Sequence, residues 1–205
     1  VWPTAGASRR GKPLRFRPTR SRSSTPGIDM AGSAPDRADG ETAAEGPAPR
    51  ERMLASVAEQ VEAIDALIER VERRLRVFDI DLSWGSWSQA TRAERLGAFL
   101  RRRDALCEIV VHDTRFLERS CPRLIALLRH HGHAFSVLRT GPEARHAMDP
   151  LVIADDRHFL HRFHIDGARA AFAQDAPQAA RPLVSRFEEI RATGEPGLTA
   201  TVLGL

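Results

Sequence analysis

From Met53 onward, apolar residues recur along the chain at alternating intervals of three and four. The series is Leu54, Val57, Val61, Ile64, Ile68, Val71 and Leu75. This spacing predicts an α-helix with a single apolar stripe. The same heptads are compatible with a two-stranded coiled coil, but only Arg76 separates them from an apolar run, residues 77–82, that predicts a strand. We therefore favour a helix that packs on its own sheet.

Two more helix and strand units follow. The pattern Thr91-Arg92-Ala93-Glu94 is a capping box and predicts the start of a helix. Residues 106–111 are almost wholly apolar, which is typical of parallel strands buried on both faces. A helix that Pro122 interrupts and Gly132 ends then precedes a third predicted strand over residues 133–138. This alternation is typical of right-handed crossovers around a parallel sheet.

The last third of the chain predicts a different arrangement. Residues 151–153 and 158–166 flank Asp155-Asp156, a pattern that predicts a β-hairpin. A final helix is predicted over residues 179–192 and an edge strand over residues 199–205. The predicted fold is therefore α/β, with a mostly parallel sheet, crossover helices and an added C-terminal β-hairpin.

Composition separates a tail from this domain. Residues 1–50 are rich in Pro, Gly, Ser, Ala and charged residues, which predicts a disordered tail, and residues 51–205 are expected to form a single domain. The chain begins with Val1, and Met30 opens an ordinary polar sequence. Residues 1–29 are therefore interpreted as an over-extended gene model or a fragment boundary.

Charge, hydropathy and cysteine usage narrow the class of protein. Residues 1–29 hold seven basic residues and one acidic residue, whereas beyond residue 50 the chain has 22 basic and 22 acidic residues. The domain lacks the basic excess of a specific nucleic-acid binder. No apolar run approaches the ~18 residues that a membrane span needs. Cys107 and Cys121 are interpreted as buried thiols, which fits a reducing compartment, so we expect a cytoplasmic protein without a membrane partner.

Polar residues stand where each of the three predicted crossover strands ends. Asp79 and Asp81 close the first strand, His112 and Asp113 follow the second, and Arg139 follows the third. Ligands of open α/β sheets bind beyond the carboxyl ends of the strands, so this edge is the predicted ligand site. The simpler alternative is that Asp79 and Asp113 cap or pair locally.

The segment from His158 to Asp166 is unusually rich in histidine. Alternation places His158, Arg162, His164 and Asp166 on one face, and makes His161 a core histidine on the other. The four residues that share the first face are candidate ligand-binding residues. His158 and His164 lie roughly 20 Å apart along a strand, however, so they cannot bind the same metal ion. We therefore predict no metal site and no cofactor.

Other functional patterns are weak. No serine occupies a glycine-flanked elbow, and no glycine-rich phosphate loop follows a strand. Trp84 and Trp87 follow the first strand and are either partner anchors or lids on the core.

The layout over about Met53 to Ala192 resembles one half of the phospholipase-D-like fold. Short phrases are also similar to an uncharacterised proteobacterial domain that can occur attached to a GNAT-type acetyltransferase. These phrases are Leu75-Arg76-Val77-Phe78-Asp79, Ile109-Val110-Val111-His112-Asp113, Cys121-Pro122-Arg123-Leu124, Asp149-Pro150-Leu151 and Leu160-His161-Arg162-Phe163-His164.

Phospholipase-D-type catalysis uses two copies of His-x-Lys followed by four residues and Asp, with a histidine nucleophile and a lysine that holds the phosphate charge. That motif is absent here. Two residues after His158, His161 and His164 stand leucine, phenylalanine and aspartate, and the chain's only lysine is Lys12. The resemblance therefore implies a degenerate half-domain.

Our leading hypothesis is a non-catalytic regulatory or partner-binding module, which includes a homodimer that mimics the two-copy ancestor. The first alternative is a hydrolase or transferase that uses His112, His158, His164 and Asp166 on a phosphorylated substrate, held by Arg139 and Arg162. The second is a structural appendage of an acetyltransferase partner.

Overall fold

The computed structural model describes residues 50–198, so the predicted tail, apart from Arg50, and the predicted edge strand at 199–205 lie outside the described residues. The elements in chain order are β1 (Arg50–Leu54), α1 (Val57–Arg70), β2 (Arg74–Asp79), α2 (Ala90–Leu100), β3 (Leu106–Val111), α3 (Arg115–Ser120), α4 (Pro122–His130), β4 (Phe135–Arg139), the 3-10 helix η1 (Pro142–Ala144), β5 (Leu151–Ala154), β6 (His158–Arg162), β7 (Ala170–Gln174), α5 (Pro177–Ala192) and β8 (Glu195–Leu198).

The described strands form one sheet in the order β1-β7-β6-β5-β2-β3-β4-β8. Strands β2, β3 and β4 are parallel, whereas every other neighbouring pair is antiparallel. The prediction of an α/β fold is confirmed, but the prediction of a mostly parallel sheet is wrong. The links from β5 to β6 and from β6 to β7 are too short to hold a crossover helix, so these strands must reverse direction.

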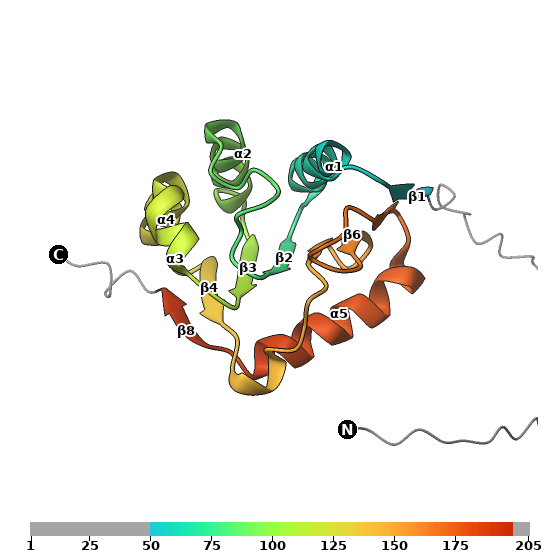
Figure 1. The fold of residues 1–205 in the computed structure, drawn as a ribbon. Helices are drawn as coiled ribbons and strands as arrows, with labels where there is room; N and C mark the ends of the chain where they lie inside the picture. Colours follow the sequence, from blue (N-terminus) through green and yellow to red (C-terminus); the bar gives the residue numbers. More distant parts are fainter. Residues whose placement is uncertain (1–49, 199–205) are drawn as a thin grey trace, which may run out of the picture. The chain divides into compact units, whose positions relative to one another are not determined.

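Helices cover both faces of the sheet. Figure 1 shows α1 to α4 over one face and α5 over the other. Side chains alternate accordingly, since Val77 and Ile109 pack in the cluster of α1 to α4, while Phe78 and Val110 pack in the cluster of α5. The carboxyl ends of β2, β3 and β4 therefore offer two separate surfaces, one under each helical layer.

The first predicted helix is too long at both ends. Leu54 belongs to β1 and Leu75 to β2, so α1 takes only the middle of the apolar stripe. A capping box starts α1, because Glu59 N donates to Ser56 Oγ at 3.2 Å and Ser56 N donates to Glu59 Oε2 at 2.9 Å. The capping box predicted at Thr91 does not form, since α2 begins after Gln89 without a side-chain cap.

The predicted hairpin is confirmed as β5 and β6, which pair antiparallel around Asp155 and Asp156. Both turn residues have positive φ angles, 51° and 58°, which aspartate tolerates better than most residues. Strand β7 was not predicted, because its sequence, Ala-Ala-Phe-Ala-Gln, has little polar and apolar alternation.

Asp155 also holds the start of β2. Its carboxylate accepts the backbone N–H groups of Glu72, Arg73 and Arg74 at 2.7, 2.9 and 2.8 Å. The hairpin tip is thereby fastened to the segment between α1 and β2, in addition to the ladder between β5 and β2.

We predict that Asp155→Ala lowers the free energy of unfolding by about 2 kcal/mol, because it removes an acceptor shared by three backbone donors and leaves alanine at a positive φ. Chemical denaturation measures the change. Asp155→Asn keeps one acceptor oxygen and tolerates the same φ, so it should cost about half as much. Equal losses in the two variants would contradict this account.

Candidate functional site

Three side chains gather at the carboxyl end of β2, on the face that α1 and α2 cover. Asp79, Trp84 and Arg162 line a pocket of about 280 Å³. The Arg162 guanidinium lies 4.6 Å from the centre of the Trp84 ring, and its Nε donates to Gly167 O at 2.8 Å. A second nitrogen donates to Ile165 O. Arg162 therefore fastens the loop between β6 and β7 over this pocket.

Asp79 is the unusual acid of this pocket. Its side chain is 1% exposed and accepts Ile80 N–H at 2.6 Å. Burial raises the pKa of Asp79 to about 7, against the lowering effect of the Ile80 N–H and the Trp84 indole. A carboxyl group that titrates near neutral pH can accept or release a proton there.

His112 faces the opposite helical layer and is fully engaged. Its ring nitrogens lie 2.6 Å from Thr140 Oγ1 and 2.7 Å from Ala147 O. Burial lowers its pKa, and its ring packs edge-on against Phe78. These hydrogen bonds fix the link after β4, and the expected ligand-binding role of His112 stays a prediction.

Asp113 and Arg139 also have local partners. Asp113 accepts Arg115 N–H at 2.9 Å, and the Arg115 side chain holds the pKa of Asp113 at about 2. This is the local capping role named as the simpler alternative. Arg139 pairs with Glu195 on β8 at 3.3 Å and is exposed. Neither residue lines the pocket of Asp79.

His164 and Asp166 lie in the loop after β6. They pair with each other at 3.4 Å, and both are exposed. Asp166 lines the pocket of Asp79, whereas His164 does not. The expected convergence of polar groups is thus limited to Asp79, Arg162 and Asp166, with Asp81 beside them.

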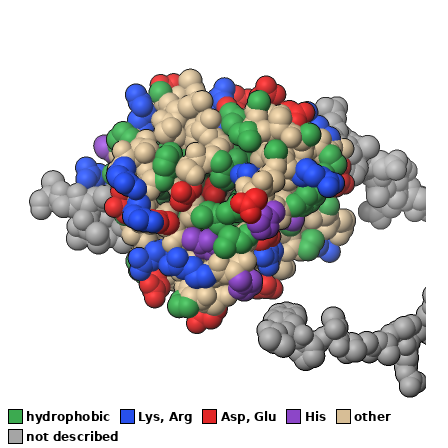
Figure 2. All heavy atoms as spheres, in the orientation of Figure 1, with side chains coloured by type: hydrophobic (Ala, Val, Ile, Leu, Met, Phe, Trp, Pro, Cys, Tyr) green, Lys and Arg blue, Asp and Glu red, His purple; other side chains and the backbone are tan. Residues whose placement is uncertain are grey.

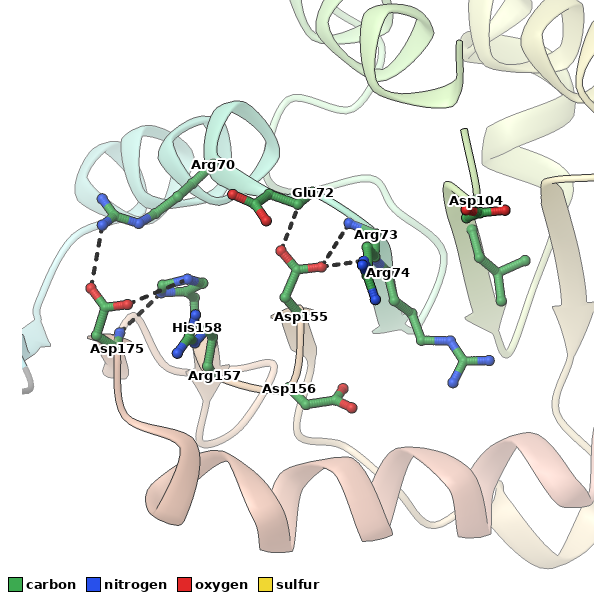
Figure 3. Close-up of a pocket in the computed structure, with 11 residues that line it drawn as sticks. Arg70, Glu72, Arg73, Arg74, Asp104, Asp155, Asp156, Arg157, His158 and Asp175 are labelled. Atoms are coloured by element: carbon green, nitrogen blue, oxygen red, sulfur yellow. Dashed lines mark hydrogen bonds and ion pairs between the residues drawn. The ribbon is translucent and has the colours of Figure 1, made fainter. Parts of the chain in front are cut away.

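His158 lies at the other end of the sheet, because β6 runs antiparallel to β5 and starts where β2 starts. It is buried, its Nδ1 accepts Asp175 N–H at 3.0 Å, and burial lowers its pKa. It lines a groove of about 620 Å³, drawn in Figure 3. The other lining residues are Arg70, Glu72, Arg73, Arg74, Asp104, Leu106, Asp155, Asp156, Arg157 and Asp175.

Sequence reasoning missed a charged cluster on the face that α5 covers. Asp149 Oδ2 lies 3.5 Å from His161 Nε2 and accepts Arg186 Nε at 2.6 Å. Burial raises the pKa of Asp149, but His161 and Arg186 outweigh it and hold that pKa at about 2. His161, predicted to be a core histidine, is 22% exposed. Arg186 lies on helix α5, far along the chain from Asp149 and His161, so no local sequence pattern indicates this cluster.

The two tryptophans differ in exposure. Trp87 is 1% exposed, with Arg92 stacked over its ring at 5.2 Å, which favours the alternative of a lid on the core, and its role as a partner anchor stays a prediction. Trp84 is partly buried beneath Arg162. Among residues 50–198, no group of three acidic, histidine or cysteine side chains has the geometry of a metal site. Figure 2 shows histidine side chains near the middle of the face drawn, among hydrophobic and acidic groups.

The fold is similar to that of solved structures from bacteria and from an archaeon. They include Nuc, a phospholipase D family member from Salmonella typhimurium, with a TM-score of 0.52 and 13% identity over 72% of this chain and 97% of that chain. NucT from Helicobacter pylori has a TM-score of 0.50 and 12% identity over 73% of this chain and 99% of that chain. TrmBL2, an archaeal chromatin protein whose structure shows a novel mode of DNA binding, has a TM-score of 0.55 and 11% identity over 76% of this chain and 56% of that chain. The chain thus spans 56% of the length of the archaeal protein. At these identities the likeness shows a phospholipase-D-like fold alone.

The family model described as a domain of unknown function, DUF7931, matches residues 56–199. The chain therefore belongs to this family, an uncharacterised domain with a phospholipase-D-like fold. No curated protein matches the chain. Within the described residues, no helix is long and apolar enough to cross a bilayer.

The raised pKa of Asp79 predicts a pH-dependent stability. The folded protein holds this proton up to about pH 7, whereas the unfolded chain releases it near 3.8. The free energy of unfolding should therefore fall as pH rises from about 4 to 7, by up to about 4 kcal/mol. In Asp79→Asn this loss should be absent, so the variant gains stability relative to the native protein at alkaline pH.

Denaturation curves at about pH 5 and pH 8 measure this difference. Asp81→Asn is the matched control, because Asp81 is partly exposed and this variant leaves Asp79 in place. Asp81→Asn should keep most of the slope. The same slope in Asp79→Asn and the native protein would contradict the role given to Asp79.

Proposed function

We propose that this domain is a non-catalytic regulatory or partner-binding module built on a phospholipase-D-like fold. The observation that carries the proposal is the burial and hydrogen bonding of His112, the histidine that follows a parallel strand at the expected ligand edge. It is 6% exposed, and both ring nitrogens have partners within the domain. A nucleophile needs an accessible nitrogen, which His112 lacks.

The other groups that such a reaction would need support the same proposal. The chain's only lysine, Lys12, lies outside the described residues, and Arg162 is engaged with Trp84 and two backbone carbonyls. Cys107 and Cys121 are buried, and burial raises the pKa of both thiols. Neither thiol is a ready nucleophile near neutral pH.

An exposed apolar edge supports the partner-binding part of the proposal. Phe163 is 44% exposed and Met148 is 36% exposed, and Ile165 N–H donates to Met148 O at 3.0 Å. Exposed aromatic residues concentrate binding energy at interfaces. We propose that a protein partner covers Phe163 and Met148, and that a second copy of this chain is that partner. An acetyltransferase partner stays a prediction.

The His161–Asp149 pair favours a second candidate, a histidine-dependent hydrolase or transferase that acts on a phosphorylated substrate. A carboxylate beside an imidazole can orient it as a general base. His161 is partly exposed, and Arg186 holds the carboxylate in place.

An assay with bis(4-nitrophenyl) phosphate separates the two candidates. We expect the release of nitrophenol to equal the buffer background, with no change in His161→Ala or His164→Ala. The exposed His130 on α4 supplies a matched control variant, His130→Ala. Turnover that disappears in His161→Ala or His164→Ala and persists in His130→Ala would overturn the non-catalytic proposal.

Sedimentation of the full chain tests the proposed partner. We expect a dimer at micromolar concentration, and a monomer for Phe163→Ser, since a polar side chain removes the central apolar contact. Met53→Ser replaces another exposed apolar residue, 53% exposed on β1, and should leave the dimer intact. A monomeric native chain, or a dimer that survives Phe163→Ser, would rule out this interface.

A further inference from the structure

The groove at the other end of the sheet suits a small charged ligand. It lies where β2, β3 and β6 begin, away from the pocket of Asp79, and its volume is about 620 Å³. Small-molecule sites commonly have volumes of this order. Every residue that lines the groove except Leu106 is ionisable, so the surface favours a charged ligand over an apolar one.

Most acids of the groove already have partners. Asp155 accepts three backbone N–H groups, and Asp156 pairs with the buried Arg76. Asp175 lies 3.3 Å from Arg70 and 3.8 Å from His158, and Figure 3 shows it turned toward both. Asp104 lies 3.8 Å from Arg103. Each of these four carboxylates therefore already has a partner within the domain, although the lining as a whole stays mixed, with five acids and four arginines.

Two arginines of the groove are not compensated. In the described part of the chain, no hydrogen bond or ion pair holds the side chain of Arg73 or Arg157, and both are exposed. Their backbones are nevertheless fixed. Arg73 N–H donates to Asp155 and Arg73 O accepts Leu106 N–H at 2.7 Å, while Arg157 O accepts Ala176 N–H at 2.8 Å. Two free guanidinium groups thus extend from fixed backbone positions on either side of Asp155 (Figure 3), so binding must order their side chains but not their backbones.

A neighbouring hollow extends this basic region. It has a volume of about 500 Å³, shares Arg157 with the groove and is also lined by Arg181 of α5. Within residues 50–198 the Arg181 side chain has no acidic partner either. Arg157 therefore stands between two hollows, with a free cation on each side of it.

We propose that Arg73 and Arg157 bind the phosphate group of a small anionic ligand in this groove. Guanidinium groups suit this role because they donate two parallel hydrogen bonds to phosphate oxygens. Glu72 opposes binding, since its carboxylate lines the groove and has no partner among the described residues. The proposal concerns a site other than the expected edge and holds whether or not the domain is catalytic.

Isothermal titration of the full chain with pyrophosphate tests the proposal. We expect saturable binding that weakens with rising salt concentration. The double variant Arg73→Ser, Arg157→Ser should weaken binding at least tenfold, because two charge-assisted contacts are lost. Glu72→Gln should tighten binding, because it removes a like charge from the groove.

A matched control accounts for the arginine-rich residues 1–29, which attract anions in every variant. Arg123→Ser, Arg169→Ser makes the same change in net charge at two exposed arginines that do not line the groove. It should keep the native affinity. Equal weakening in the two double variants, or no binding by the native chain, would overturn the proposal.

This result is distinct from that of the hydrolysis assay. Binding without turnover supports both the groove and the non-catalytic proposal. Turnover of bis(4-nitrophenyl) phosphate that depends on His161 would remove the non-catalytic proposal and leave the groove as it stands.

Discussion

The pairing of β5 with β2 is the constraint on which the rest of the structure depends. β2 has a parallel neighbour, β3, on one side and an antiparallel neighbour, β5, on the other, so it joins the crossover half of the sheet to an antiparallel half formed by β5, β6, β7 and β1. Asp155 secures this seam, because its carboxylate accepts the backbone N–H groups of the two residues before β2 and of Arg74, its first residue, and its own N–H donates to Arg74 O. The direction in which β5 pairs with β2 also determines which polar side chains lie at each end of the sheet.

The elements that the sequence predicted correctly are those whose pattern lies within a few consecutive residues. The apolar run of β3 and the Asp155-Asp156 turn could be recognised because a buried strand and a tight turn each leave a signature within a few residues. The direction of β5 relative to β2 leaves no such signature, which is why the sheet was predicted to be mostly parallel. Strand β7 could not be recognised for a different reason. Its alanines are buried on both faces, Ala170 in the cluster of α1 to α4 and Ala171 and Ala173 in the cluster of α5, so its sequence shows no polar alternation.

The candidate site was predictable in part. Asp79 was placed at the correct edge, but its buried state depends on Trp84 and on a loop that Arg162 holds in place. His158 and Arg162 share a face of β6, yet they stand at its first and last residues, about 13 Å apart, so they lie at opposite ends of the sheet. Burial of His112 depends on Thr140 and Ala147, which follow another strand. Such contacts are long-range, and no spacing in the sequence encodes them.

The two ends of the sheet differ in whether their arginine side chains have partners within the domain. A lysine is a single point charge, whereas the guanidinium of Arg162 donates to two carbonyls and stacks on Trp84 at the same time. These contacts stabilise the loop between β6 and β7. They also occupy the donors of Arg162, which are therefore not free to bind a ligand at the carboxyl edge. At the opposite end the carboxylates are held by backbone donors and by other arginines, so Arg73 and Arg157 keep their donors free. Arg73 and Arg157 therefore offer free charge at the amino ends of the parallel strands, whereas parallel-sheet topology alone predicts a ligand at their carboxyl ends.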